Sequence, residues 1–161
     1  LPATMLYLQR RGRLSDEQIW RALATGGIVG NVVKTNASVS GAEAGCQAEI
    51  GTATAMAAAA VCSLAAHSLE ITEYAAEIAL EHQLGLTCDP VGGYVQIPCI
   101  ERNAVAAMRA IDSADLASVL SGTRKISFDL VVKTMYETGR DLNGRYRETS
   151  EGGLASGYKV C

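Results

Sequence analysis

The sequence predicts a mainly α-helical domain: a multi-helix bundle with a central Ala-rich helix and cysteines carried on loops. Capping residues recur before amphipathic stretches, and strand-like alternation is scarce. Residues 50–69 contain no Asp, Glu, Lys or Arg. That run could span a bilayer, but it is mostly Ala, Ser, Thr and Gly, with too little Leu, Ile and Val for insertion. We therefore expect a helix buried in the middle of the bundle, and no membrane association.

The first two expected helices have local start or stop signals. Ser15 followed by Gln18 is a capping-box pattern, and it opens a helix that should close at the glycine pair 26–27. The Ala-rich helix should start near Cys46 and continue to about residue 66. Its small residues should permit close contacts between helices.

The remaining helices are marked in the same way. Ser68 can cap a helix that runs to residue 84, with Gly85 just past its end. Pro98 suits the first turn of a helix that runs to about residue 120. Ser127 can cap residues 128–138, stopped by Gly139. Residues 93–97 are the only tempting strand, and residues 151–157 indicate a flexible tail.

Composition places the chain among intracellular enzymes and metal proteins. Its 161 residues make one domain, residues 1–161. A net charge of −3 and few aromatic residues give nucleic-acid binding no electrostatic basis. Five cysteines are too sparse for a disulfide framework, and the odd count favours a reducing compartment, so we expect a cytoplasmic protein.

Three cysteines lie in segments marked by Gly or Pro: Cys46, Cys88 and Cys99. Three thiolates can hold three corners of an iron–sulfur cube and leave the fourth iron open as a Lewis acid. Their spacings match no general zinc or ferredoxin pattern, and free cysteines are commonly just buried, so spacing alone leaves both interpretations open. Cys62 is excluded, because 16 helical residues would separate it from Cys46 by roughly 24 Å.

Several long segments resemble the iron–sulfur-dependent L-serine dehydratases, the bacterial L-serine ammonia-lyases that do not use pyridoxal phosphate. Around the cysteines these are KTNASVSGAEAGCQ (residues 34–47), AAEIALEHQLGLTCDPV (residues 75–91) and QIPCIERNA (residues 96–104). Near the end they are TMYETGRDLN (residues 134–143) and YRETSEGGLA (residues 146–155). The segments follow in order and cover nearly the whole chain from about residue 30.

The resemblance implies a [4Fe–4S] cluster held by Cys46, Cys88 and Cys99, and conversion of L-serine to pyruvate and ammonia. It also implies that the chain is the C-terminal part of the catalytic α region. Upstream catalytic sequence and a regulatory β domain would be its missing partners, so we expect the chain alone to be poorly active. We further expect the protein to form homo-oligomers. In the implied reaction the open iron takes the hydroxyl group, and a positioned base removes the Cα proton.

The residues before Cys46 are candidates for substrate or cluster contact. Lys34, Asn36, Ser38 and Ser40 offer a cation, an amide and two hydroxyls in one short segment. The alternative is that the Asn and Ser side chains form turns and helix caps.

Two further candidates precede or follow Cys88. His82 is expected on the apolar face of its helix, where it is either functional or a core histidine with its hydrogen bonds satisfied. A separate stripe of glutamates on this helix, which includes Glu77, is expected to face solvent. Asp89 can orient a proton donor or cap a turn.

Cys161 is the last residue, and its thiol and carboxylate resemble the hydroxyl and carboxylate of serine. We predict that it folds back and occupies the open iron when substrate is absent.

Two rival interpretations remain. A pyridoxal-phosphate enzyme would use Lys34 as its Schiff-base lysine, but no Gly/Ser phosphate cradle is evident and the cysteines would be unexplained. A non-catalytic domain would hold an electron-transfer cluster or a structural metal. Visible spectra and serine turnover separate the three.

Overall fold

A computed structural model describes residues 1–120, 122 and 124–158. Every named element in that part of the chain is helical, as predicted. In chain order they are α1 (Pro2–Gly12), α2 (Asp16–Asn36), α3 (Gly41–Ala44), the π-helical turn η1 (Gln47–Gly51), α4 (Thr52–Leu64), α5 (Leu69–Glu81), α6 (Cys99–Val119), α7 (Phe128–Asp141), the 3₁₀ turn η2 (Gly144–Tyr146) and α8 (Gly153–Gly157). Residues 93–97 form no strand, and the described chain has only an isolated bridge between Val91 and Tyr94.

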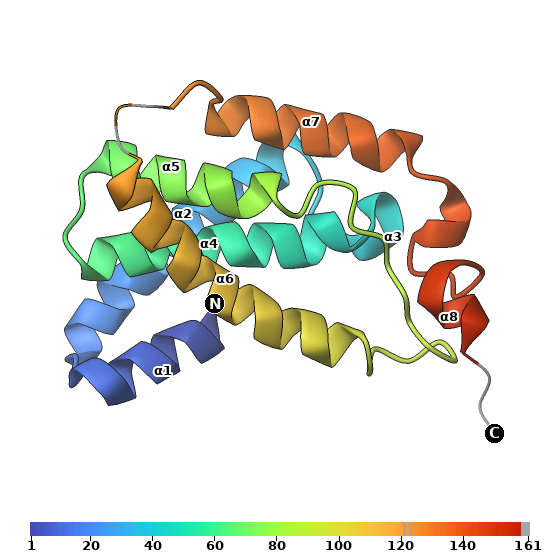
Figure 1. The fold of residues 1–161 in the computed structure, drawn as a ribbon, viewed down its shortest axis with the longest axis horizontal. Coiled ribbons are helices and arrows are strands. Elements are labelled where there is room, and N and C mark those ends of the chain that lie inside the picture. Colours follow the sequence, from blue (N-terminus) through green and yellow to red (C-terminus); the bar gives the residue numbers. More distant parts are fainter. Residues whose placement is uncertain (121, 123, 159–161) are drawn as a thin grey trace.

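The Ala-rich helix α4 lies at the centre of the bundle, which confirms the prediction. It contacts α2, α5 and α6, and Figure 1 shows these helices around it. Its residues Ala55 and Ala58 have no exposed surface. Alanine side chains let the neighbouring backbones approach closely, so the bundle is held by many short helix–helix contacts. Among the described helices none is long and apolar enough to cross a membrane.

Three helix starts are confirmed by their capping bonds. Ser15 and Gln18 form the reciprocal capping box of α2. Ser68 caps α5 by accepting a hydrogen bond from Ile71 N–H. Ser127 caps α7 in the same way. These signals are local, because a cap needs only residues within one turn.

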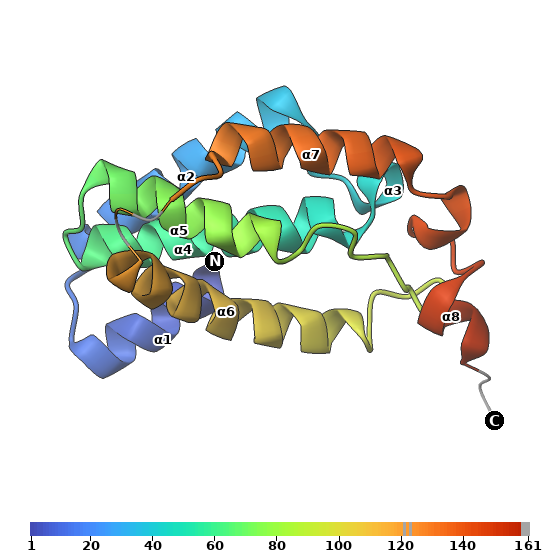
Figure 2. The ribbon, with the colours of Figure 1, turned by 45° about the horizontal axis from the view of Figure 1, so that its top comes forward.

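Two predicted helix ends are wrong, because the glycines there are packing residues rather than terminators. Helix α2 continues through Gly26 to Asn36, and α7 continues through Gly139 to Asp141. A Cβ atom on Gly26 would lie 2.7 Å from the carbonyl oxygen of Met56 in α4. A Cβ on Gly139 would lie 2.5 Å from the Cβ of Ala44 in α3, and Figure 2 shows α7 beside α3.

Neighbouring glycines in α2 should respond oppositely to alanine. Gly26→Ala is expected to lower the free energy of unfolding by about 1–3 kcal/mol, because the added Cβ meets rigid backbone. Gly27 has open space at its Cβ position, so Gly27→Ala should raise the same quantity by about 0.5–1 kcal/mol through helix propensity. Denaturant unfolding of both variants tests this. Changes of the same sign would contradict the packing role of Gly26.

The C-terminal segment is not a flexible tail. Residues 153–157 form the short helix α8, and Gly152 and Ala155 are buried. Helix α5 also ends earlier than predicted, at Glu81. Figure 1 places α8 at the end of the molecule where α6 begins. The tail therefore packs against the loop between α5 and α6, because that loop offers it hydrogen-bond partners, as detailed below.

The expected solvent-facing glutamate stripe on α5 is wrong at Glu77, which is 1% exposed. Its Oε1 has no hydrogen-bond partner among the described residues. Burial, then the neighbouring Glu81 carboxyl, raise the pKa of Glu77 to about 7, although Arg124 acts in the opposite direction. Arg124 lies over the Tyr74 ring and covers this side of α5.

Stability should therefore depend on pH through Glu77. Its folded pKa lies above the unfolded value of 4.5, so its favourable contribution is complete below about pH 4.5 and is lost as the pH rises through about 7. Relative to Glu77→Gln, the wild type should therefore lose on the order of 1–3 kcal/mol of unfolding free energy as the pH rises over that range. Urea unfolding at about pH 5 and about pH 8 measures it. A difference that does not change with pH would contradict the assignment.

Candidate metal centre

Cys46 and Cys88 lie side by side although 42 residues separate them in the sequence. Their sulfur atoms are 3.7 Å apart, and both residues are buried. Cys46 follows Gly45, whose φ of 73° is a left-handed conformation that suits glycine. Cys46 is the N-cap residue of the turn η1, so its thiol is fixed at the junction of a tight loop and a helix.

The buried Gln47 holds the Cys88 loop against η1. Its side-chain Oε1 accepts a hydrogen bond of 2.9 Å from Gly85 N–H, and its Nε2 donates to Met135 O in α7. Its backbone N–H donates to Leu86 O at 3.2 Å. One residue therefore connects the loop, η1 and α7.

Cys99 is the first residue of α6 and is also buried. In the described chain, the possible metal-ligand atoms of Cys46, Glu49 and Cys88 all lie within 4.8 Å of one another. The sulfur of Cys99 is not part of this group, so it does not lie that close to both other thiols. Burial raises the pKa of the Cys99 thiol, and the charge at Cys46 raises it further. The third thiol thus lies within electrostatic range of the close pair but outside its immediate contact.

Arg102 lies one turn after Cys99 and ties α6 to the Cys88 loop. Its guanidinium donates to Thr87 O at 2.7 Å and to Asp89 Oδ2 at 2.6 Å. The Asp89 side chain is 2% exposed, and the Arg102 side chain is 18% exposed. Burial alone would raise the pKa of Asp89, but hydrogen bonds from Arg102 and Leu154 N–H leave it below its ordinary value.

The thiols at the centre have unequal pKa values. The hydrogen bond from Cys88, together with the nearby guanidinium of Arg102, lowers the pKa of Cys46 to about 7 against the effect of burial. The same interaction with Cys46, together with burial, raises the pKa of Cys88. Away from this centre, burial raises the pKa of the Cys62 thiol to about 11.

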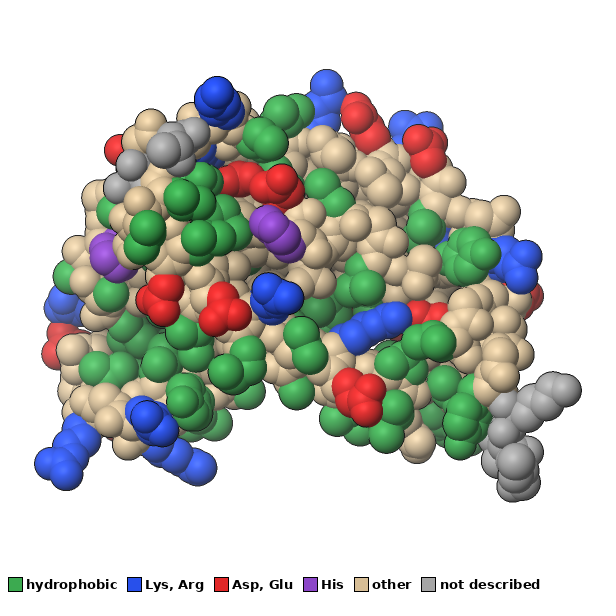
Figure 3. Space-filling model, in the orientation of Figure 1, with side chains coloured by type: hydrophobic (Ala, Val, Ile, Leu, Met, Phe, Trp, Pro, Cys, Tyr) green, Lys and Arg blue, Asp and Glu red, His purple; other side chains and the backbone are tan. Residues whose placement is uncertain are grey.

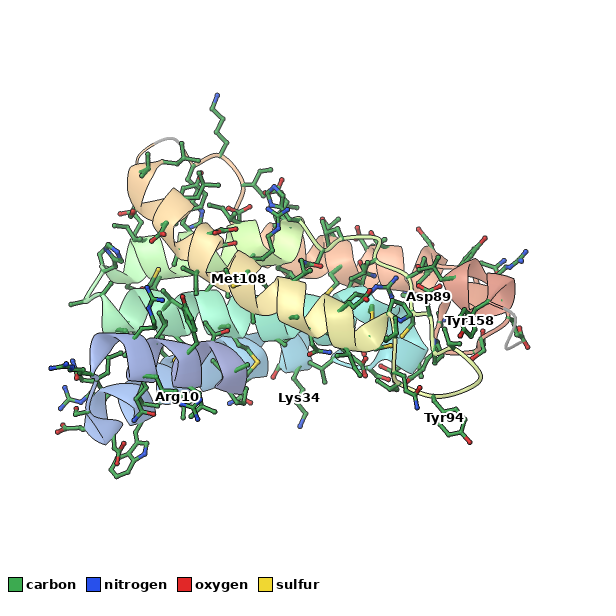
Figure 4. The ribbon with its side chains drawn as sticks, turned by 60° about the horizontal axis from the view of Figure 1, so that its bottom comes forward. Arg10, Lys34, Asp89, Tyr94, Met108 and Tyr158 are labelled. Carbon is green, nitrogen blue, oxygen red and sulfur yellow. The ribbon has the colours of Figure 1, made fainter. Side chains whose placement is uncertain are left out.

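The C-terminal segment covers the outer side of the Cys88 loop. Asp89 Oδ1 accepts a hydrogen bond of 2.7 Å from Leu154 N–H, and Cys88 N–H donates to Tyr146 O at 2.9 Å. The Ser150 hydroxyl donates to Pro90 O. Figure 4 shows Asp89 and Tyr158 at the same end of the molecule. Residues 146–154 therefore help to fix the loop that carries Cys88.

Lys34 and Glu49 line one cavity of about 420 Å³, between α2 and the start of α4. Glu49 lies one turn after Cys46, so its carboxylate connects this cavity to the thiol pair. Lys34 is exposed, and in Figure 4 its side chain points away from the body of the molecule.

The other polar residues of the segment make local bonds. Asn36 Nδ2 donates to Val32 O at 2.8 Å, one turn earlier in α2. The Ser38 hydroxyl donates to Glu43 Oε2 at 2.5 Å and accepts from Ser40 N–H at 3.1 Å. These are the turn and cap interactions of the alternative interpretation, and within the described part of the chain they do not involve a cysteine.

The remaining predicted residues lie elsewhere. His82 is exposed at the end of α5, with Nδ1 2.8 Å from Ile78 O, and it lines a separate cavity of about 290 Å³ with Glu77 and Glu81. Cys62 is fully buried in the main core, whereas Cys46 and Cys88 belong to a different apolar cluster. Cys161 lies outside the described residues.

Sequence reasoning missed three residues of this centre: Gln47, Glu49 and Arg102. Glu49 and Arg102 each follow a predicted cysteine ligand by three residues. In a helix this spacing places two side chains on one face, so the signal was present. The role of Gln47 depends on a loop 38 residues away and has no local signal.

The donor set fits an iron–sulfur cluster. Two buried thiols are in contact, a third buried thiol lies within electrostatic range of them, and a nearby guanidinium offsets negative charge. Thiolates are the ligands that such clusters take. Thiolates of such a cluster would bind different irons, whereas the sulfurs of Cys46 and Cys88 lie 3.7 Å apart, so these two residues would have to move apart to hold one.

Comparison with known proteins agrees with these observations. Residues 1–155 match the family described as serine dehydratase alpha chain. The chain is 50% identical to an L-serine dehydratase of Haemophilus influenzae and 51% identical to L-serine dehydratase TdcG of Escherichia coli, each over 96% of its length. It is 49% identical to an L-serine dehydratase of Streptomyces coelicolor over 100% of its length. It spans only 34% to 36% of the length of these relatives.

Proposed function

The chain belongs to the serine dehydratase alpha chain family, and we propose that it carries the metal centre of a lyase that converts L-serine to pyruvate and ammonia. The observation that carries this proposal is the contact between the buried Cys46 and Cys88, with Cys99 and Arg102 close enough to interact electrostatically with Cys46. The L-serine dehydratases to which it is similar support the choice of substrate. We also propose that the protein is cytoplasmic, where the four described cysteines would stay free thiols.

Cys46, Cys88 and Cys99 would hold a [4Fe–4S] cluster in this proposal. When bound through three thiolates, such a cluster supplies a Lewis-acidic iron for the hydroxyl group that leaves. The protein keeps the ligand sulfurs buried, which limits access of water and oxidants. Arg102 places positive charge beside Cys46 and so favours its thiolate form.

Asp89 is a positioning residue rather than a proton carrier in this account. Both of its oxygens already accept hydrogen bonds, from Arg102, Thr87 and the Leu154 N–H. These bonds join α6, the Cys88 loop and the C-terminal segment. Asp89 therefore acts by holding Cys88 in place.

Lys34 and Glu49 are our proposed contacts for the charged groups of the substrate, and the exposed Lys34 side chain would turn inwards to reach them. The cavity they line has room for a molecule of the size of serine, and Glu49 reaches from it towards the thiol pair. A lysine ammonium can bind the carboxylate of an amino acid, and a carboxylate can bind its ammonium. Ser40 follows Val39, which lines this cavity, and stays a candidate, while Asn36 and Ser38 shape the turn.

The rest of the protein, we propose, covers the outer face of α6. Val105, Met108 and Val119 on this helix are each more than half exposed. Figure 3 shows hydrophobic side chains along the hollowed lower face of the molecule, and Figure 4 places Met108 on this side. Large apolar residues that gather on one face mark an interaction surface, either with further catalytic or regulatory sequence or within a homo-oligomer.

Hydrogen exchange tests this coverage. Backbone amides of α6 should exchange more slowly in the full-length protein than in the present chain, since docking lowers the frequency of local opening. The amides of α4, buried in both, serve as the control. Equal exchange of α6 in the two proteins would contradict the proposal.

The activity itself is tested on anaerobically prepared full-length protein. We expect pyruvate and ammonia from L-serine, with loss of both after exposure to air. A sharp imine absorption, with turnover that survives air, would instead indicate pyridoxal phosphate and contradict the proposal.

A further inference from the structure

We propose that Cys46, Cys88 and Glu49 form a second metal site, which takes a single divalent cation of the zinc type when no cluster is bound. The site shares two ligands with the proposed cluster but replaces Cys99 with a carboxylate. It concerns the cluster-free protein and does not depend on serine being the substrate.

The separation of the two sulfurs matches one tetrahedral ion. Two Zn–S bonds of about 2.3 Å that meet at the tetrahedral angle span about 3.8 Å. The observed separation of Cys46 Sγ and Cys88 Sγ is 3.7 Å. The two thiols are therefore already placed to bind the same ion.

The carboxylate of Glu49 supplies the third ligand. All three ligand atoms lie within 4.8 Å of one another. Glu49 is exposed, so its side chain can rotate the short distance that a metal–oxygen bond requires. Two thiolates and one carboxylate are a ligand set that zinc accepts, and the exposed side leaves a fourth position for water.

Gly41 leaves room for the side chains of two of the three ligands. A Cβ on Gly41 would lie 3.0 Å from Glu49 Oε2 and 3.3 Å from Cys88 Sγ, so a larger residue there would crowd both ligands. Gln47 fixes the Cys88 loop against η1, which carries Glu49 and follows Cys46. The three ligands are thus held by short connections before any ion binds, which reduces the entropy lost on binding.

The cluster and a single zinc ion cannot be bound at the same time. In a cube, two thiolates are separated by two Fe–S bonds and an edge between irons, whereas on a single ion they share one centre. Cys46 and Cys88 cannot satisfy both arrangements at once. A bound zinc ion would therefore block cluster assembly until it is removed.

Cobalt titration of cluster-free, anaerobic full-length protein tests the site, because Co²⁺ takes the same geometry and is visible. The wild type should bind one Co²⁺ per chain at this site, with thiolate charge-transfer absorption that added Zn²⁺ abolishes. Glu49→Gln should lower the cobalt affinity by at least about tenfold, since even outer-shell changes have effects of that size. It should still take up iron and sulfide.

Matched cysteine variants separate this site from the cluster. Cys99→Ser should bind cobalt like the wild type but lose the cluster, Cys46→Ser should lose both, and Cys62→Ser should lose neither. The proposal is overturned if Cys99→Ser weakens cobalt as much as Cys46→Ser, or if Glu49→Gln leaves the cobalt affinity unchanged. Cobalt binding with this pattern, in a protein that never takes up iron and sulfide, would support this site and refute the proposed function.

Discussion

Serine in place of Cys46, Cys88 or Cys99 is expected to leave the full-length protein without bound iron and without conversion of serine to pyruvate. A hydroxyl is a poor replacement for a thiolate on iron, and each of the three thiols would hold one corner of the cluster. The loss should exceed the roughly 10–100-fold effects of outer-shell changes. Iron and sulfide analysis of each variant, beside a pyruvate assay, measures it.

Cys62→Ser is the matched control for these variants. Cys62 is as buried as the other three, but it lies in the main core with α4 neighbours. We expect it to keep the wild-type iron content and activity, with some loss of stability from the buried hydroxyl. Loss of iron from Cys62→Ser, together with retention of iron by Cys99→Ser, would contradict the ligand assignment.

Removal of the Arg102 guanidinium is the second change with a large expected effect. Arg102→Met should lower the free energy of unfolding by about 3–5 kcal/mol, because it leaves the Asp89 carboxylate buried without its ion partner. The Cys88 loop also loses the bond to Thr87 O, so the iron content should fall as well. Denaturant unfolding and iron analysis measure the two effects separately.

A double variant distinguishes the ion pair from a general loss of packing. Asp89→Asn combined with Arg102→Met should be more stable than the sum of the two single effects predicts, since neither charge is then left alone. Arg102→Lys keeps the charge but not the forked geometry and should fall between wild type and Arg102→Met. Strict additivity, with a normal iron content in Arg102→Met, would contradict the role of this pair.

Helix starts could be predicted from sequence because their causes are local. Ser15, Ser68 and Ser127 each bond to a backbone N–H three residues later. Helix ends at glycine could not be predicted in the same way. Gly26 and Gly139 serve contacts with other helices, and a single sequence does not show which glycines terminate a helix and which admit a neighbour.

The proposed ligands of the metal centre could be named from the sequence, but the residues that support them could not. Cys46, Cys88 and Cys99 were identifiable from the resemblance and from their Gly- and Pro-marked surroundings. The bonds that hold them cross between distant segments, such as Gly85 to Gln47 and Leu154 to Asp89. For that reason the prediction of a flexible terminal segment was wrong. Leu154 bonds to the buried carboxylate of Asp89, 65 residues earlier, and the residues around Leu154 do not indicate such a distant partner.

The central claim is that serine deamination depends on an iron–sulfur cluster held by this chain. The most direct measurement is the iron and acid-labile sulfide content of anaerobic full-length protein, compared with its rate of pyruvate formation across partly loaded samples. The account predicts about four iron and four sulfide per chain at full activity, with a rate that rises in proportion to loading and vanishes with the Cys99→Ser variant. Pyruvate formation at an undiminished rate by protein stripped of iron would contradict it.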